Sequence, residues 1–102
     1  MESAEIRIGS ARLRREDHSI CLGERSIALT ALEFRLLWYL AEREGRLLTR
    51  AQILAQVWDD RSGVPTRVVD VHVASLRKKL QDLGIAADIE GVRGMGYRFN
   101  AG

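Results

Sequence analysis

The chain has 102 residues, 46% of them hydrophobic and 29% charged, so its length suits one domain and its composition excludes a disordered or collagen-like chain. A single cysteine excludes an internal disulfide and indicates a reducing, cytoplasmic location, and the longest apolar run, residues 36–41, is too short to cross a membrane. The net charge of +2 does not by itself indicate a nucleic-acid partner, but basic residues gather in two segments, 66–80 and 91–98.

Short strands are predicted over residues 5–29. Apolar residues there alternate with polar ones, and turn residues such as Gly9-Ser10 and Gly23-Glu24 separate the alternating segments. The apolar positions are Ile6, Ile8, Leu13, Ile20, Leu22, Ile27 and Leu29. This pattern predicts a small antiparallel meander, in which Cys21 is a small buried residue rather than a redox centre.

Two capping boxes predict the starts of two helices. In Thr30-Ala-Leu-Glu33 and Thr49-Arg-Ala-Gln52, a threonine hydroxyl and the side chain three residues later can satisfy the first free amides of a helix. The first helix is expected to run to about residue 44 and the second to about residue 58. A polar loop, residues 59–65, follows the second helix.

The third helix is predicted from near Thr66 to the residue before Gly84. A core stripe at spacings of three and four consists of Val69, Val73, Leu76, Leu80 and Leu83. The opposite face carries Arg67, Val68, Val71, Ala74, Ser75 and Lys78. Small side chains on this face would let the backbone lie deep in a DNA major groove, where valine methyls can contact thymine methyls. The same face could instead pack against another part of the protein.

The chain is predicted to end in a β-hairpin. Residues 87–90 and 97–100 have the pattern of short strands, and the glycine-rich segment 91–96 lies between them. Three helices followed by such a hairpin give the element order of a winged helix, an α+β fold.

These segments closely resemble the OmpR/PhoB family of response-regulator output domains. The matching segments are Val69-Asp-Val-His-Val-Ala-Ser-Leu-Arg-Lys-Lys-Leu80, Val92-Arg-Gly-Met-Gly-Tyr-Arg-Phe99, Leu29 to Leu37, and Leu48 to Trp58. The resemblance implies a four-stranded antiparallel N-terminal sheet, three helices and a C-terminal hairpin wing. It also implies that a phosphorylatable receiver domain precedes the output domain. Because the chain has no acidic phosphoacceptor cluster and no length for one, we expect residues 1–102 to be the output domain alone.

The resemblance also implies residue roles in DNA binding. It implies that the helix at about 66–83 enters the major groove and that the wing at about 91–97 enters the minor groove. The implied phosphate or base contacts on this helix are Arg67, His72 and Arg77, and the implied base-edge contacts are Val68, Val71 and Ser75. The implied contacts elsewhere are Arg93 in the minor groove, Tyr97 on a phosphate and Trp58 on the DNA backbone.

Some residues depart from the family pattern or have a second interpretation. Ala74 and Ser75 stand where some members have arginines, so base readout is expected to rest more on Arg77 and Lys78. Gly91 replaces a threonine that contacts phosphate in many members. The structural alternatives are a packing role for His72, a mainly buried role for Trp58, a buried ring with an outward hydroxyl for Tyr97, an orienting role for Asp70, and solvation for Lys79.

The implied partners follow from the family. They are duplex DNA with tandem half-sites, RNA polymerase at loop 59–65, and a histidine kinase acting on the receiver domain.

No catalytic site, metal site or cofactor is predicted. His18 and His72 lie in different predicted elements, and no cysteine, serine or carboxylate cluster accompanies them at ligand spacing. The glycines at 91, 94 and 96 lie between strands rather than before a helix, which argues against a dinucleotide site. The remaining alternative to DNA binding is a winged helix that contacts only proteins, and salt-dependent retention on DNA would separate the two.

Overall fold

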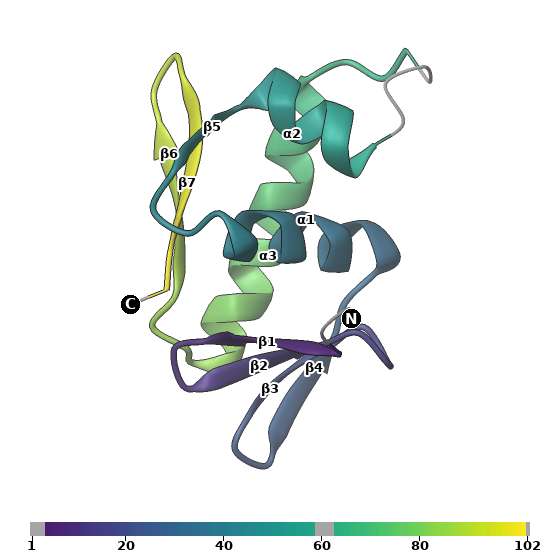
Figure 1. Ribbon diagram of the computed structural model, residues 1–102, viewed down its shortest axis with the longest axis vertical. Coiled ribbons are helices and arrows are strands. Elements are labelled where there is room, and N and C mark those ends of the chain that lie inside the picture. The colour runs from purple at the N-terminus through teal and green to yellow at the C-terminus, as the bar shows by residue number, and fades with distance from the viewer. Residues whose placement is uncertain (1–3, 59–62, 102) are drawn as a thin grey trace.

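The computed structural model describes residues 4–58 and 63–101, which form three helices and seven strands (Figure 1). The strands are β1 (Glu5–Ile8), β2 (Ala11–Arg14), β3 (Ser19–Leu22), β4 (Arg25–Ala28), β5 (Leu47–Thr49), β6 (Asp88–Val92) and β7 (Gly96–Asn100). The helices are α1 (Ala31–Glu42), α2 (Arg50–Val57) and α3 (Arg67–Leu83). The predicted α+β winged helix is confirmed. None of the described helices is long and apolar enough to span a membrane.

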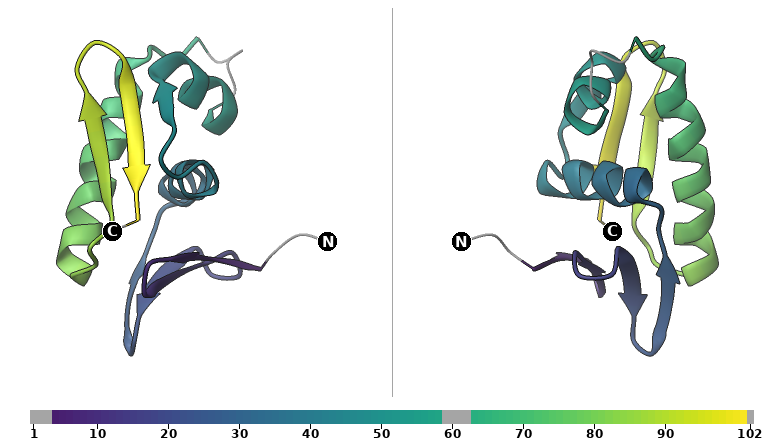
Figure 2. Two further views of the ribbon diagram at one scale, coloured as in Figure 1. Left: turned by 60° about the vertical axis from the view of Figure 1, so that its left-hand side comes forward. Right: turned by 90° about the vertical axis from the view of Figure 1, so that its right-hand side faces the viewer.

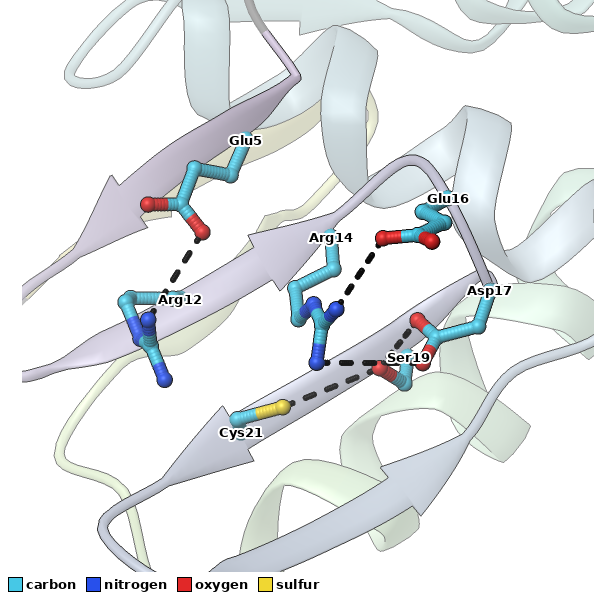
Figure 3. Close-up of polar contacts among 7 residues, drawn as sticks. All are labelled: Glu5, Arg12, Arg14, Glu16, Asp17, Ser19 and Cys21. Carbon is cyan, nitrogen blue, oxygen red and sulfur yellow. Dashed lines mark hydrogen bonds and ion pairs between the residues drawn. The ribbon is translucent and has the colours of Figure 1, made fainter.

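The N-terminal meander is confirmed as a four-stranded antiparallel sheet in the order β1-β2-β3-β4. Alternation along the strands sends Ile8, Leu13 and Ile20 into the core, where each is at most 1% exposed. The other face is polar and is shown in Figure 3, where Arg14 lies beside Glu16 and Asp17.

Cys21 lies on the polar face of this sheet but is buried. Its side chain is 7% exposed, and its Sγ atom lies 3.7 Å from the Oγ atom of Ser19. Ser19 in turn donates a 2.6 Å hydrogen bond to Asp17 (Figure 3). Cys21 is therefore the small buried residue that was predicted.

Both predicted capping boxes are present. The Thr30 amide donates to Glu33 Oε1 over 2.9 Å while the Glu33 amide donates to the Thr30 hydroxyl over 3.1 Å. Thr49 and Gln52 exchange hydrogen bonds of the same two lengths at the start of α2. Helix α1 ends at Glu42, two residues before the predicted end, and the turn that follows contains Gly45 with a φ of 82°.

Helix α3 has the predicted core stripe and the predicted end. The stripe residues Val69, Val73, Leu76, Leu80 and Leu83 are each at most 2% exposed. Gly84 closes the helix in the left-handed conformation, with a φ of 83°.

The C-terminal strands form a larger sheet than a hairpin. Strand β5 was not predicted, and it pairs with β7 to give the order β5-β7-β6. Strands β6 and β7 also extend further than predicted, to Val92 and from Gly96, so only residues 93–95 form the tip. Gly96 makes this sheet possible, because a Cβ atom there would lie 1.9 Å from the Leu48 carbonyl oxygen.

Helix α3 and the β6–β7 hairpin lie side by side in every view (Figures 1 and 2). The N-terminal end of α3 and the tip of the hairpin lie at the same end of the molecule, while the C-terminal end of α3 reaches β4 of the N-terminal sheet. One surface therefore contains both an exposed helix face and an exposed hairpin tip.

Candidate nucleic-acid interface

The exposed face of α3 is built from small residues and cations. Val71 is 64% exposed, which is unusual for a β-branched aliphatic residue. Arg67, Ala74 and Lys78 are also exposed on this helix. Val68, predicted to face base edges, is half-buried and packs against the core, which reduces the area that it can offer to DNA.

The tip of the hairpin carries a cation and a second exposed apolar residue. The Met95 amide donates to the Val92 carbonyl over 3.0 Å, and Gly94 takes a φ of 75°, so residues 92–95 form a tight turn. Arg93 is exposed on this turn, and Met95 is 56% exposed. A single arginine on a narrow hairpin has the shape and charge that suit a minor groove.

Three basic side chains on this surface have no partner within residues 4–58 and 63–101. They are Arg67 and Lys78 on α3 and Arg93 on the wing, and each is exposed. Arg14 and Arg50, elsewhere in the described chain, are by contrast held by carboxylates. Unpaired cations concentrate positive potential where a phosphate backbone would lie.

Asp70 joins α2, α3 and the wing. Its Oδ1 atom accepts a 2.8 Å hydrogen bond from Arg50 Nε and another from the Tyr97 hydroxyl. The hydrogen bond from Tyr97, followed by the ion pair with Arg50, lowers the pKa of Asp70, while burial and Asp70 raise the pKa of Tyr97. Asp70 therefore has the orienting role that was its predicted alternative.

Tyr97 lies mainly in the core. The residue is 6% exposed, so the predicted burial of its ring is confirmed. Its hydroxyl points to Asp70 rather than outward, which corrects the predicted orientation. Because a DNA phosphate only accepts hydrogen bonds and the hydroxyl has one proton, the expected phosphate contact would require the hydroxyl to leave Asp70.

Arg77 connects the recognition helix to the wing. Its Nε and one Nη donate to the carbonyl oxygen of Ile89 on β6, and its guanidinium lies 5.6 Å from the Tyr97 ring centroid. The side chain is half-buried in this position. Helical spacing could not predict this contact, because the carbonyl lies on β6, a strand outside the helix. An arginine has five N–H donors, so donors remain for a DNA contact.

Trp58 and His72 pack against one another at the end of α2. Their rings meet edge to face with centroids 5.1 Å apart, and Trp58 is 8% exposed. The Nδ1 atom of His72 lies 3.0 Å from the Val68 carbonyl oxygen, and the residue is half-buried. Both residues thus have the packing role that was their predicted alternative, and His72 Nε2 is the ring nitrogen left for another partner.

A buried carboxylate on α1 binds two side chains of α3. Ser75 donates to Glu33 Oε2 over 2.5 Å, and Lys79 donates to Glu33 Oε1 over 2.6 Å. Lys79 is therefore paired rather than only solvated, which corrects its predicted role. Ser75, predicted to face base edges, has its hydroxyl proton directed toward α1 instead.

The described residues do not form other kinds of site. No group of three or more histidine, cysteine, aspartate or glutamate side chains within residues 4–58 and 63–101 is close enough to hold a metal ion. The predicted polymerase-contacting loop lies partly outside the described residues, at 59–62.

Comparisons with known proteins identify the family of this chain. Residues 23–99 match the family described as transcriptional regulatory protein, C terminal. The transcriptional activator protein IrlR of Burkholderia pseudomallei is 42% identical over 96 residues, which cover 94% of this chain and 42% of IrlR. The phosphate regulon regulator PhoB of Rhizobium meliloti is 41% identical over 95 residues, 93% of this chain and 42% of PhoB. The chain thus spans less than half the length of these curated relatives.

Solved structures show the same similarity. The DNA-binding domain of the response regulator AdeR, in complex with an intercistronic region, has a TM-score of 0.82 and 27% identity, covering 93% of this chain and 98% of that chain. The DNA-binding domain of Klebsiella pneumoniae RstA, in complex with the RstA box, has a TM-score of 0.75 and 30% identity, covering 98% of this chain and 100% of that chain.

Proposed function

This chain belongs to the family of transcriptional regulatory protein C-terminal domains, in its OmpR/PhoB type, and we propose that it binds double-stranded DNA sequence-specifically as the output domain of a two-component response regulator. The observation that carries this proposal is the shared surface of α3 and the wing, with its exposed Val71 and the unpaired cations Arg67, Lys78 and Arg93. The DNA complexes of the similar AdeR and RstA domains support it.

The recognition helix, about residues 66–83, occupies the major groove. Arg67 and Lys78 contact phosphates from the two ends of its exposed face, because long cations there reach past the small residues between them. Val71 contacts a thymine methyl group at the centre. Arg93 enters the neighbouring minor groove from the wing.

The residues that are held by internal contacts contribute from the edges of this surface. Arg77 and His72 are half-buried and each keeps a nitrogen that its internal contact does not use, through which it contacts DNA. Trp58 and Tyr97 are buried, and Tyr97 contacts a phosphate only when its hydroxyl leaves Asp70. Val68 and Ser75 contribute only contacts of their exposed carbon atoms. The affinity therefore depends more on the three unpaired cations than on these residues.

We further propose that this domain acts within a longer response regulator that has additional partners. Since the curated relatives are more than twice the length of the matched segment, we place a phosphorylatable receiver domain before this one, with a histidine kinase acting on it in the cytoplasm. Residues 59–65 contact RNA polymerase, and two copies bind tandem half-sites.

The test is retention on DNA. A site would be selected from a random duplex library with the domain, and its affinity compared with that of a scrambled duplex at two salt concentrations. We expect preference for the selected site and an affinity for both duplexes that falls steeply with salt. If no library member were retained at low salt, DNA binding would be contradicted and a winged helix that contacts only proteins would be favoured.

A further inference from the structure

We propose that Glu33 is a positioning residue for DNA recognition, because its buried carboxylate on α1 fixes the rotation of α3 about its own axis through Ser75 and Lys79. This inference rests on the proposed DNA binding. It assigns a role in sequence discrimination to a residue on a different helix from those expected to contact bases.

The carboxylate is fully engaged by hydrogen-bond donors. Glu33 is 3% exposed, and its Oε1 atom accepts from the Thr30 amide at 2.9 Å and from Lys79 Nζ at 2.6 Å. Its Oε2 atom accepts from Ser75 Oγ at 2.5 Å. Lys79 also donates to the Ala28 carbonyl at 3.3 Å, so the same ammonium reaches the end of β4. Charged hydrogen bonds of this length are strong and directional.

Capping of α1 does not explain this arrangement. The second capping box, Thr49 with Gln52, has hydrogen bonds of the same lengths but uses a neutral, exposed glutamine. A buried carboxylate is costly unless donors compensate it, and here the donors come from α3. Burial raises the pKa of Glu33, but the hydrogen bonds from Lys79, Ser75 and the Thr30 amide hold it at about 2. The charge is thus stabilised by α3 rather than needed for the cap.

The rotation of α3 decides which side chains reach DNA. Its core stripe is entirely aliphatic, and the hydrophobic effect has no preferred direction, so polar contacts add direction. Asp70 and Arg77 supply such contacts toward α2 and the wing, and Ser75 and Lys79 supply them toward α1. Residues at spacings of four form a row along a helix, so Val71, Ser75 and Lys79 lie in one row. Glu33 holds two members of this row, and the third, Val71, is the exposed residue proposed to contact a base. A rotation that released Ser75 and Lys79 would therefore displace Val71.

The main variant is Glu33→Gln, because Gln52 shows that a glutamine satisfies the cap. We expect affinity for the selected site to fall about tenfold, with less than a twofold change on the scrambled duplex, since the phosphate-contacting cations remain. The matched control is Gln52→Ala, which removes the hydrogen bond that the Gln52 side chain accepts from the Thr49 amide in the second capping box. It should lower the melting temperature without changing the ratio of the two affinities.

A pair of neighbouring lysines provides an independent measurement. Lys79→Met leaves the α1 cap intact, and we expect it to reduce the ratio of the two affinities with little change in their salt dependence. Lys78→Met removes an unpaired cation, and we expect it to weaken both duplexes alike and lower the salt slope by about one.

The outcomes are distinguishable. If the wild-type domain bound no duplex, both the proposed function and this inference would fail. If the wild-type domain discriminated between the duplexes and Glu33→Gln and Lys79→Met discriminated equally well, only the positioning role would be overturned. The same holds if Glu33→Gln lost affinity equally on both duplexes, because a purely structural role predicts that result.

Discussion

At the scale of single residues, the unpaired cations separate affinity from specificity. Arg67 is exposed at the start of α3 and has no ion pair among the described residues. We expect Arg67→Ala to weaken selected and scrambled duplexes by the same factor and to lower the salt slope by about one, as the loss of one phosphate contact requires. Binding at two salt concentrations measures this. A loss confined to the selected site would make Arg67 a base-reading residue instead.

Glu33 also gives a prediction about acid stability. Its pKa of about 2 in the folded protein lies below the ordinary value of 4.5, so it contributes stability above the ordinary value and loses it as the pH falls toward 2. The full contribution is on the order of 3 kcal/mol, from about 1.36 kcal/mol per unit of pKa. We expect the difference in melting temperature between wild type and Glu33→Gln to be large at pH 6 and to shrink by pH 3. A constant difference would show that the Glu33 charge does not stabilise the fold.

Several residue roles could not be predicted from the sequence, for a physical reason. Ser75 and Lys79 lie 42 and 46 residues from Glu33, and Arg77 donates to a carbonyl on another sheet. Helical spacing identifies the face that a side chain occupies but not the partner that a long or polar side chain finds there. Val71 and Arg67, which that spacing places on the outward face, are exposed, and their contacts with DNA stay predictions.

At the scale of elements, strong local signals were predictable and pairing was not. The capping boxes and the α3 stripe lie within a few turns of chain, so composition and spacing indicate them directly. Strand β5 has three residues, too few to show a period, and it exists because β7 pairs with it. The predicted β6–β7 hairpin is present, but its pairing with β5 into a three-stranded sheet was therefore not predicted.

Two glycines of the wing, Gly96 and Gly94, test whether the close approach of β7 to β5 requires a residue without a side chain. Gly96 has a φ of 153°, and an added Cβ would overlap the Leu48 carbonyl, so Gly96→Ala should destabilise the domain by at least about 2 kcal/mol. Gly94 has a φ of 75° but open space around it, so Gly94→Ala should cost only about 1 kcal/mol. Thermal and denaturant unfolding measure both. Equal costs would show that the contact with Leu48 is not the constraint.

Leu76 tests which face of α3 points toward the core. The residue is 0% exposed and lies in the core stripe, so Leu76→Ala should lower the free energy of unfolding by about 2–5 kcal/mol. Val71→Ala, on the opposite face, should leave the unfolding free energy nearly unchanged and relax discrimination at one thymine. A Leu76→Ala variant that melted like wild type but lost DNA binding would mean that the roles assigned to the two faces are reversed.

At the scale of the whole molecule, one recognition helix and one wing limit how tightly a single domain can bind. Three unpaired cations supply few phosphate contacts, and interfaces of single modules are small. A longer response regulator of the proposed kind should therefore gain affinity by placing two copies of this domain on tandem half-sites, since joining them raises the effective concentration of the second copy.

Two copies of the domain joined by a flexible linker provide the test of this gain. On a duplex with two tandem copies of the selected site, we expect the linked pair to bind 10²–10⁴ times more tightly than one domain, the range that effective concentration provides. Reversing one half-site should remove most of this gain, because each domain has a single α3 and wing on one surface and must turn around to read the reversed site. Footprints of the longer protein on strictly inverted repeats would contradict the tandem arrangement while leaving the binding mode of each domain intact.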